Sequence, residues 1–195
     1  MSDKSGSPVL KLCLPEWLSY EESLLTQSLV SVEQRMEWVL SLGRKNIGSD
    51  QPGQGGPFAA AVFDADDHHL VAAGVNLVLP AQCSVLHAEI VALMQAQQRL
   101  GCHRLDLVEG RRFELVSSTE PCAMCLGAIP WAGVARLVCG ARDEDARAVG
   151  FDEGDKPEQW PKKLEQRGLE VVTDVRRDDA AALLRTYQAQ QGVIY

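Results

Sequence analysis

The sequence predicts an α/β fold in which helices cover both faces of one sheet. Apolar runs of strand length alternate along the chain with segments whose apolar residues recur at helical spacing. The chain has 195 residues, a length that suits a single domain with one continuous core. Hydrophobic residues make up 46% and charged residues 24%, which is the balance of an ordinary soluble globular protein.

The first 30 residues have no regular pattern, and we expect an irregular leader that packs on the domain or extends from it. The domain itself is expected to span residues 31–195, including a C-terminal helix and tail. Apolar residues at helical spacing predict its first helix over 31–46. A loop rich in Gly, Pro and Gln then follows over 48–57.

Two runs rich in Ala and Val, 58–63 and 70–79, are expected to pair as a hairpin because acidic turn residues separate them. The next helix is expected over 85–100, with Ser84 as its N-cap and Gly101 as its end. The remaining expected elements are a strand over 112–117, a helix over 122–129, a strand over 134–139, an acidic loop to Asp155, a helix over 157–167, a strand over 169–173, a helix over 178–190 and a tail over 192–195.

The charge balance bears on the partners of the protein. Lys and Arg number 19 against 27 Asp and Glu, which gives a formal net charge of -8. Nucleic-acid binding depends on clustered Lys and Arg, whereas the basic residues here are scattered pairs beside acids, so no nucleic-acid partner is expected. No signal-peptide pattern opens the chain, and no run approaches the ~18 apolar residues of a membrane span. We therefore expect a cytoplasmic protein with no membrane partner, whose six cysteines are buried thiols or metal ligands.

Two short segments have the residue types of a metal centre. His87-Ala88-Glu89 opens a predicted helix, and Pro121-Cys122-Ala123-Met124-Cys125 leads from a strand into a helix. Cysteines three residues apart can direct both sulfurs at one ion, and a helix N-terminus favours their thiolate forms. His87, Cys122 and Cys125 together supply three ligands for Zn²⁺, which leaves a fourth position for water.

Glu89 has the spacing of a proton carrier at such a centre. It follows the His87 ligand by two residues, so its carboxylate can lie beside the metal without binding it. Zinc lowers the pKa of bound water to about 7, and a neighbouring carboxylate can take and return its proton. A redox Cys pair leaves His87 and Glu89 without a role, and a structural zinc site normally has a fourth protein ligand. The joint pattern is described for zinc base deaminases.

The motifs resemble those of the cytidine deaminase-like superfamily, and within it the small zinc guanine deaminases. The superfamily resemblance covers about residues 31–174, and the closer resemblance extends to the Tyr195 tail. The additional residues that carry the closer resemblance are Gly56 to Val62, Asn76, Trp131 to Val134 and Gly150 to Gly154. It implies a three-layer α/β/α sandwich around a five-stranded mixed sheet, a homodimer, and hydrolysis of free guanine to xanthine and ammonia.

The resemblance also implies roles for individual residues. Asn76 is expected to hydrogen-bond the purine, although an asparagine that only closes a strand end is the alternative. Glu153 is expected to contact the substrate and to act as a second proton carrier, with Asp152 as the other candidate for this role. The remaining expected substrate contacts are the aromatic rings of Phe58 and Trp131, the backbone amide of Ala60, and Tyr195 as a closing residue.

Other functions remain open at this point. The same metal chemistry serves deaminases of aminotriazines such as ammeline, of cytosine or cytidine, and of adenosine in tRNA. The net charge of -8 argues against the tRNA substrate. A non-catalytic zinc binding module is the alternative from a different class, and an intact Glu89 argues against it.

Overall fold

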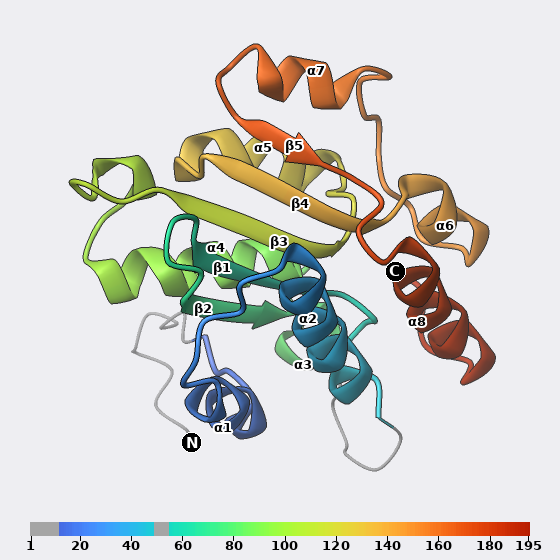
Figure 1. Ribbon diagram of the computed structural model, residues 1–195. Coiled ribbons are helices and arrows are strands. Elements are labelled where there is room, and N and C mark those ends of the chain that lie inside the picture. The colour runs from blue at the N-terminus through green and yellow to red at the C-terminus, as the bar shows by residue number, and fades with distance from the viewer. Residues whose placement is uncertain (1–11, 49–54) are drawn as a thin grey trace, which may run out of the picture.

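The computed structural model describes residues 12–48 and 55–195 of the chain. Its central element is a five-stranded sheet with the order β2-β1-β3-β4-β5 (Figure 1). The strands are β1 Ala59–Asp64, β2 Leu70–Val75, β3 Phe113–Thr119, β4 Arg136–Ala141 and β5 Glu170–Val172. The helices are α1 Glu16–Leu24, α2 Val32–Asn46, α3 Val78–Ala81, α4 Ala88–Leu100, α5 Ala123–Ala132, α6 Asp143–Ala148, α7 Trp160–Glu165 and α8 Arg177–Ala189, with a short 3₁₀ helix at Leu105–Leu107.

The sheet is mixed in its strand directions. Strand β1 pairs antiparallel with both β2 and β3, whereas β3, β4 and β5 run parallel to one another. The register of β1 and β3 pairs Ala60 with Ser117. This register brings the start of β1 to the level of the carboxyl end of β3, where the next helix begins.

Alternation along the strands sends side chains into two separate cores. Ala59, Ala61 and Phe63 of β1 join one buried cluster, which includes the apolar side chains of α2 and α8. Ala60 and Val62 join the other cluster, which includes those of α4, α5 and α7. Figure 1 shows α2 in front of the sheet and α4 behind it. The predicted three-layer α/β/α sandwich with a five-stranded mixed sheet is therefore confirmed.

The region between the hairpin and α4 differs from the prediction. The strand expected over 70–79 ends at Val75, and α3 begins three residues later. The side-chain oxygen of Asn76 accepts from the Val78 amide and so turns the chain out of the sheet. The predicted Ser84 N-cap is also wrong: α4 begins after His87, whose side chain makes no capping hydrogen bond. Gly101 ends this helix in the left-handed conformation, as predicted.

Two segments expected to be irregular contain helices. The leader forms α1, whose buried Leu18 packs on the domain. Glu22 of α1 accepts from the Ala73 amide of β2 and pairs with Arg99, so this helix covers the free edge of the sheet. The acidic loop before Asp155 contains α6, whose first turn holds three acids at the positive end of the helix dipole. The parts of the predicted leader and loop at 1–11 and 49–54 lie outside the described residues.

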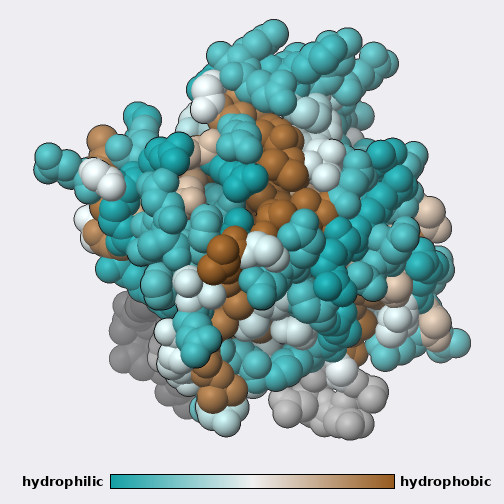
Figure 2. Space-filling view, viewed as in Figure 1, coloured by the Kyte–Doolittle hydropathy of each residue, from teal (hydrophilic) through white to brown (hydrophobic). Residues whose placement is uncertain are grey.

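The outer surface is dominated by polar side chains. Figure 2 shows a largely hydrophilic face with hydrophobic residues gathered over β4 and β5. Within 12–48 and 55–195, the structure contains no helix long and apolar enough to cross a membrane.

Candidate active site

Two helix N-termini meet at the carboxyl end of β3 and present the predicted metal ligands. His87 is the N-cap of α4, and Cys122 is the N-cap of α5. Cys125 follows in the first turn of α5 and is fully buried. These positions give each thiol the unpaired amides and the positive dipole end of a helix, which favour thiolate.

The three ligands lie at distances that suit one small ion. Their ligating atoms are all within 4.8 Å of one another. His87 Nδ1 lies 3.4 Å from Cys122 Sγ, in hydrogen-bond contact. An imidazole and two thiols form a donor set that zinc prefers, and three protein ligands leave one position open. The residues present therefore fit a catalytic zinc ion.

The electrostatics of these groups favour the thiolate form at Cys122 and the protonated form at Cys125. A hydrogen bond from Cys125 lowers the pKa of the Cys122 thiol to about 4, against the opposing effect of burial. Burial disfavours the charged form of His87, but the hydrogen bond with Cys122 and the negative charges of Glu89, Cys122 and Glu153 together outweigh it, so the pKa of the imidazole is raised. The hydrogen bond between Cys125 and Cys122 raises the pKa of the Cys125 thiol.

Glu89 lies in the first turn of α4, beside the ligands. Its side chain is 6% exposed. Burial is the main cause that raises the pKa of Glu89, and the charge of Cys122 adds to it. A carboxyl group with a raised pKa can both take and return a proton near neutral pH. The structure therefore brings the predicted proton carrier to the predicted ligands.

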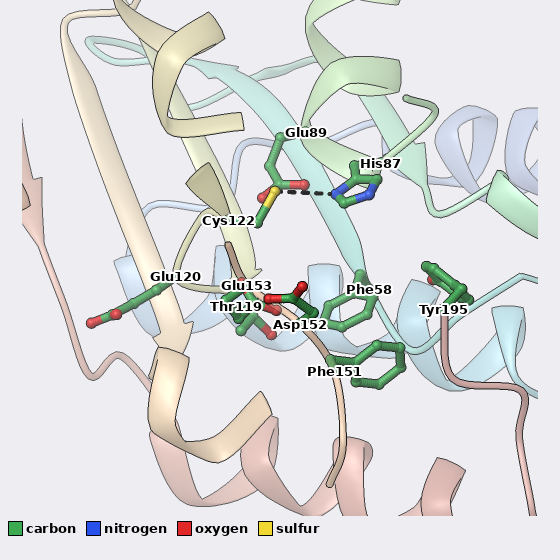
Figure 3. Close-up of a pocket in the computed structure, with 10 residues that line it drawn as sticks. All are labelled: Phe58, His87, Glu89, Thr119, Glu120, Cys122, Phe151, Asp152, Glu153 and Tyr195. Carbon is green, nitrogen blue, oxygen red and sulfur yellow. Dashed lines mark hydrogen bonds between the residues drawn. The ribbon is translucent and has the colours of Figure 1, made fainter. Parts of the chain in front are cut away.

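A pocket opens beside this cluster. Figure 3 shows its side chains, with His87, Cys122 and Glu89 gathered at one part of the wall. The lining residues are Phe58, His87, Glu89, Thr119, Glu120, Cys122, Phe151, Asp152, Glu153 and Tyr195.

The two acids expected at the substrate differ in environment. Glu153 is 6% exposed and borders the pocket. Burial, followed by the charges of Cys122 and Glu89, raises the pKa of Glu153 to about 8. Asp152 lies at the rim with a side chain that is 86% exposed, and its Oδ1 accepts from the Gly154 amide. Glu153 is therefore the better placed of the two to meet a bound molecule.

The segment that carries Glu153 is tied to the turn that carries the thiols. The Ala123 amide donates to the Glu153 carbonyl at 2.9 Å. Lys156, whose side chain is 7% exposed, donates to the Pro121 carbonyl at 3.1 Å and pairs with Asp143 at 2.8 Å. These bonds fix the position of Glu153 relative to Cys122.

Aromatic rings form the side of the pocket away from the ligands. Phe58 and Phe151 meet edge to face with ring centroids 4.8 Å apart. Tyr195 contacts Phe151 at 5.5 Å, so the C-terminal residue completes this wall. The predicted wall residues Phe58 and Tyr195 therefore lie at the pocket.

Asn76 lies next to the pocket residues but is not among those that line it. Its side chain is 1% exposed, and Oδ1 accepts from the Val78 amide at 3.2 Å and the Gly56 amide at 3.4 Å. The Nδ2 atom is buried and has no partner within the described residues. The side chain thus closes the strand end and keeps one donor unused, so its predicted contact with a purine stays a prediction.

Two predicted substrate contacts are not at the pocket. Ala60 is fully buried in β1 and pairs with Gly74 and Ser117 on its two sides, so the sheet uses its backbone. Trp131 is 75% exposed and borders a separate surface hollow with Arg104 and Arg167. It follows Cys122 by nine residues, which is about 13 Å along a helix axis. Ala60 and Trp131 are therefore not among the residues that line this pocket, and their predicted substrate contacts stay predictions.

Four residues at the site were not among those predicted from the sequence. Thr119, Glu120 and Phe151 border the pocket, and Lys156 holds its acidic segment in place. Thr119 ends the strand before Glu120-Pro121-Cys122, and strand ends are where side chains reach a site, so that signal was available. A buried Lys in an acidic loop had no local signal, because Asp143 is distant along the chain.

The chain is similar to known zinc-dependent proteins. Residues 33–141 match the family described as the cytidine and deoxycytidylate deaminase zinc-binding region. A guanine deaminase from Bacillus subtilis is 36% identical over 117 residues, which are 60% of this chain and 70% of that protein.

Two solved structures match nearly the whole chain. A structure reported as guanine deaminase from Nitrosomonas europaea is 48% identical, with a TM-score of 0.86 over 93% of this chain and 97% of that chain. A mutant protein in complex with 8-azaguanine is also 48% identical, with a TM-score of 0.86 over 93% of this chain and 98% of that chain.

Proposed function

The chain belongs to the zinc-binding cytidine and deoxycytidylate deaminase family, and we propose that it hydrolyses free guanine to xanthine and ammonia. One observation carries this proposal: Glu89 and two of the three grouped ligands, His87 and Cys122, border the same pocket as a second buried acid, Glu153. The similarity to guanine deaminases from two bacteria, and to a protein that binds a guanine analogue, supports the choice of base.

The residues of this chain divide the work of a hydrolytic deamination. His87, Cys122 and Cys125 would hold zinc. When bound, zinc lowers the pKa of water to about 7 and so makes hydroxide available at neutral pH. Glu89 takes a proton from the attacking water and passes it to a ring nitrogen, and then takes the proton of the hydroxyl group formed at C2 and gives it to the departing amino group. The C2–N bond breaks and a C2–O bond forms, so that one water is consumed for each ammonia released.

Glu153 gives the pocket its preference for guanine over adenine. Guanine presents N1–H and an amino group as neighbouring donors, whereas adenine has an acceptor at N1. Burial keeps Glu153 mostly protonated near neutral pH in the empty pocket, and the two donors of guanine favour its ionised form. That carboxylate accepts from both donors and has no matching partner for the adenine edge. A site built for hydrogen bonds rejects a mismatched polar edge strongly, because its own groups are left unpaired.

Shape and charge support a free base rather than a tRNA substrate. The pocket is lined on one side by the rings of Phe58, Phe151 and Tyr195. Its rim is acidic, with Asp152 exposed beside Glu153. Phosphate groups are repelled by such a rim, whereas an uncharged base is not.

The test is ammonia release from a panel of compounds, with zinc measured on the same sample. The panel holds guanine, guanosine, adenine, cytosine, cytidine, ammeline and unmodified tRNA. We expect one zinc per chain and the highest kcat/KM for guanine, with loss of activity on chelation and recovery on zinc addition. A higher kcat/KM for another member reassigns the substrate, and zinc binding without any ammonia release supports the binding module instead.

We also propose that the protein is a homodimer that pairs through α5. This helix contains no charged residue, and it exposes 38% of Met124 and 75% of Trp131. Large exposed apolar side chains on a helix of this kind suit a protein interface. Light scattering should give twice the chain mass, and Trp131→Glu should halve it. Tyr20→Glu, at an apolar residue of α1 that is 62% exposed, is the control and should stay dimeric.

A further inference from the structure

Thr119 is a polar residue of the pocket that the roles described so far do not use. It is the last residue of β3 and lies three positions before Cys122. Its side chain is 3% exposed, and it borders the pocket together with Glu89 and Glu153. Figure 3 shows it among the pocket side chains, in the same part of the view as Glu153.

The hydroxyl of Thr119 is buried and unpaired. Its Oγ1 atom has no hydrogen-bond partner within the described residues. The preceding Ser118 is equally buried, but its Oγ accepts from the Ala59 amide at 3.1 Å. The two neighbouring hydroxyls therefore differ in their hydrogen bonding within the described residues, and the one without a partner, that of Thr119, belongs to a residue that borders the pocket.

An unpaired buried hydroxyl has an energetic cost. Leaving such a group without a partner costs about 1–3 kcal/mol, and native proteins contain few of them. Valine has nearly the same shape and would fill this position without the cost. A threonine here is best explained by a partner that arrives with the ligand.

We propose that the Thr119 hydroxyl hydrogen-bonds the polar edge of the bound base and is a specificity-determining residue of this site. The inference rests on the proposed deaminase function and adds a contact to it. A hydroxyl both donates and accepts, so it can meet a ring N–H, a ring nitrogen or an exocyclic oxygen. Tyr195 supports the same reasoning, because its hydroxyl is also buried, unpaired within the described residues and at this pocket.

The test compares Thr119→Val with Thr119→Ser on whichever base of the panel the wild-type holoenzyme deaminates fastest. We expect Thr119→Val to lower kcat/KM by about tenfold or more, since one hydrogen bond to the ligand is lost. Thr119→Ser keeps the hydroxyl and should stay within threefold of the wild type. Thr186→Val is the control, because Thr186 is exposed on α8 and its hydroxyl already donates to the Ala182 carbonyl.

Stability and binding separate this role from a packing role. Thr119→Val should keep its zinc and should unfold at the same or a higher temperature, because the variant removes an unpaired polar group. In a Glu89→Gln background, which prevents turnover, Thr119→Val should also weaken binding of the same base by about tenfold, measured by calorimetry.

Two results would overturn the inference. One is a Thr119→Val enzyme with kcat/KM and base affinity within threefold of the wild type. The other is a Thr119→Val enzyme that loses activity together with thermal stability while Thr119→Ser loses both as well, which indicates packing. Failure of the proposed function is distinguished by the wild type itself, which would then turn over a different member of the panel.

Discussion

Glu89 and Glu153 are two buried carboxyl groups that border the same pocket from different segments of the chain. Burial raises the pKa of both, and in Glu153 the charges of Cys122 and Glu89 add to it, to a value of about 8. Two acids that border the same site can take different roles when their surroundings differ. Glu89 begins a helix beside the ligands, whereas Glu153 lies on a loop across the pocket, so we assign proton transfer to the first and base recognition to the second.

Glu89→Gln tests the proton-transfer role. The amide has nearly the same shape but cannot take a proton, so we expect kcat to fall at least about 100-fold, the usual size of a general acid–base contribution. Zinc content should remain at one per chain, since Glu89 is not among the three grouped ligands. Ammonia release and metal analysis of the same preparation check both parts. Activity close to that of the wild type would remove Glu89 from the mechanism.

Glu153→Gln tests the recognition role. We expect fold and zinc to be retained and kcat/KM for guanine to fall by about tenfold to 100-fold, the size of a lost hydrogen bond to a charged group. Asp152→Asn provides the comparison, because the Asp152 side chain is 86% exposed and should matter little. Steady-state kinetics of both variants decide between the two acids. The opposite order of effects would transfer the recognition role to Asp152.

At the scale of helices and strands, periodicity predicted most elements and failed where local hydrogen bonds decide. Apolar character over runs of strand length identified the five strands, because each strand packs on both core layers. It continued the second strand to residue 79, since Val78 and Leu79 are as apolar as a strand residue. The side chain of Asn76 ends that strand by accepting from the Val78 amide, which no apolar pattern reveals.

The candidate site also contains residues that the sequence predicted and residues that it did not. The metal cluster was predictable because its ligands belong to two short motifs, each within one helix N-terminus. Trp131 was expected at the pocket because of the motif in which it occurs, but its side chain is exposed at the surface. A position in the helix that begins at Cys122 does not determine the direction in which a side chain points. Lys156 was missed because its partners Pro121 and Asp143 meet it only in the folded chain.

Lys156→Met tests whether the link between the thiol turn and the acidic segment matters for activity. Lys156 joins the Pro121 carbonyl to Asp143, and its loss should let Glu153 move relative to Cys122. We expect KM to rise by about tenfold with a smaller change in kcat, since the base contact loosens while the ligands stay in place. Lys156→Arg should restore part of the loss.

Lys162→Met is the matched control for this prediction, because Lys162 is exposed on α7. It should leave both kinetic constants within twofold of the wild type. A Lys156→Met enzyme with unchanged KM would show that the acidic segment keeps its position without this cation.

On the scale of the whole molecule, ion pairs join three segments in the C-terminal part of the chain, which are α6, α8 and the residues after β5. Arg177 of α8 pairs with Glu144 and Asp145 of α6, and Arg142 pairs with Asp174 after β5. These pairs connect segments more than 30 positions apart, as the separation of 32 between Arg142 and Asp174 shows. They hold α6, and the segment with Glu153 that follows it, against α8.

The change in the free energy of unfolding at acid pH tests this network of ion pairs. Hydrogen bonds from Arg177 and Arg142 lower the pKa of Asp145 and of Asp174, respectively. A carboxyl whose folded pKa lies below the unfolded value of about 3.9 stabilises the protein above that value, and the contribution is lost as pH falls through the folded pKa. Arg177→Met should therefore lower the free energy of unfolding only slightly near pH 7, since solvent screens ion pairs at the surface.

The difference in the free energy of unfolding between wild type and Arg177→Met is more informative than the pH dependence of either protein alone. Protonation of the metal ligands destabilises both proteins in acid, so that effect cancels, and the remaining difference should shrink towards zero below pH about 3.9. Arg185→Met, at an exposed residue of α8 with no ion pair within the described residues, should show no such difference at any pH. Urea unfolding from pH 7 to pH 3 provides the measurement. A difference that persists unchanged at pH 3 would mean that Arg177 acts through packing of its aliphatic stem rather than through its charge.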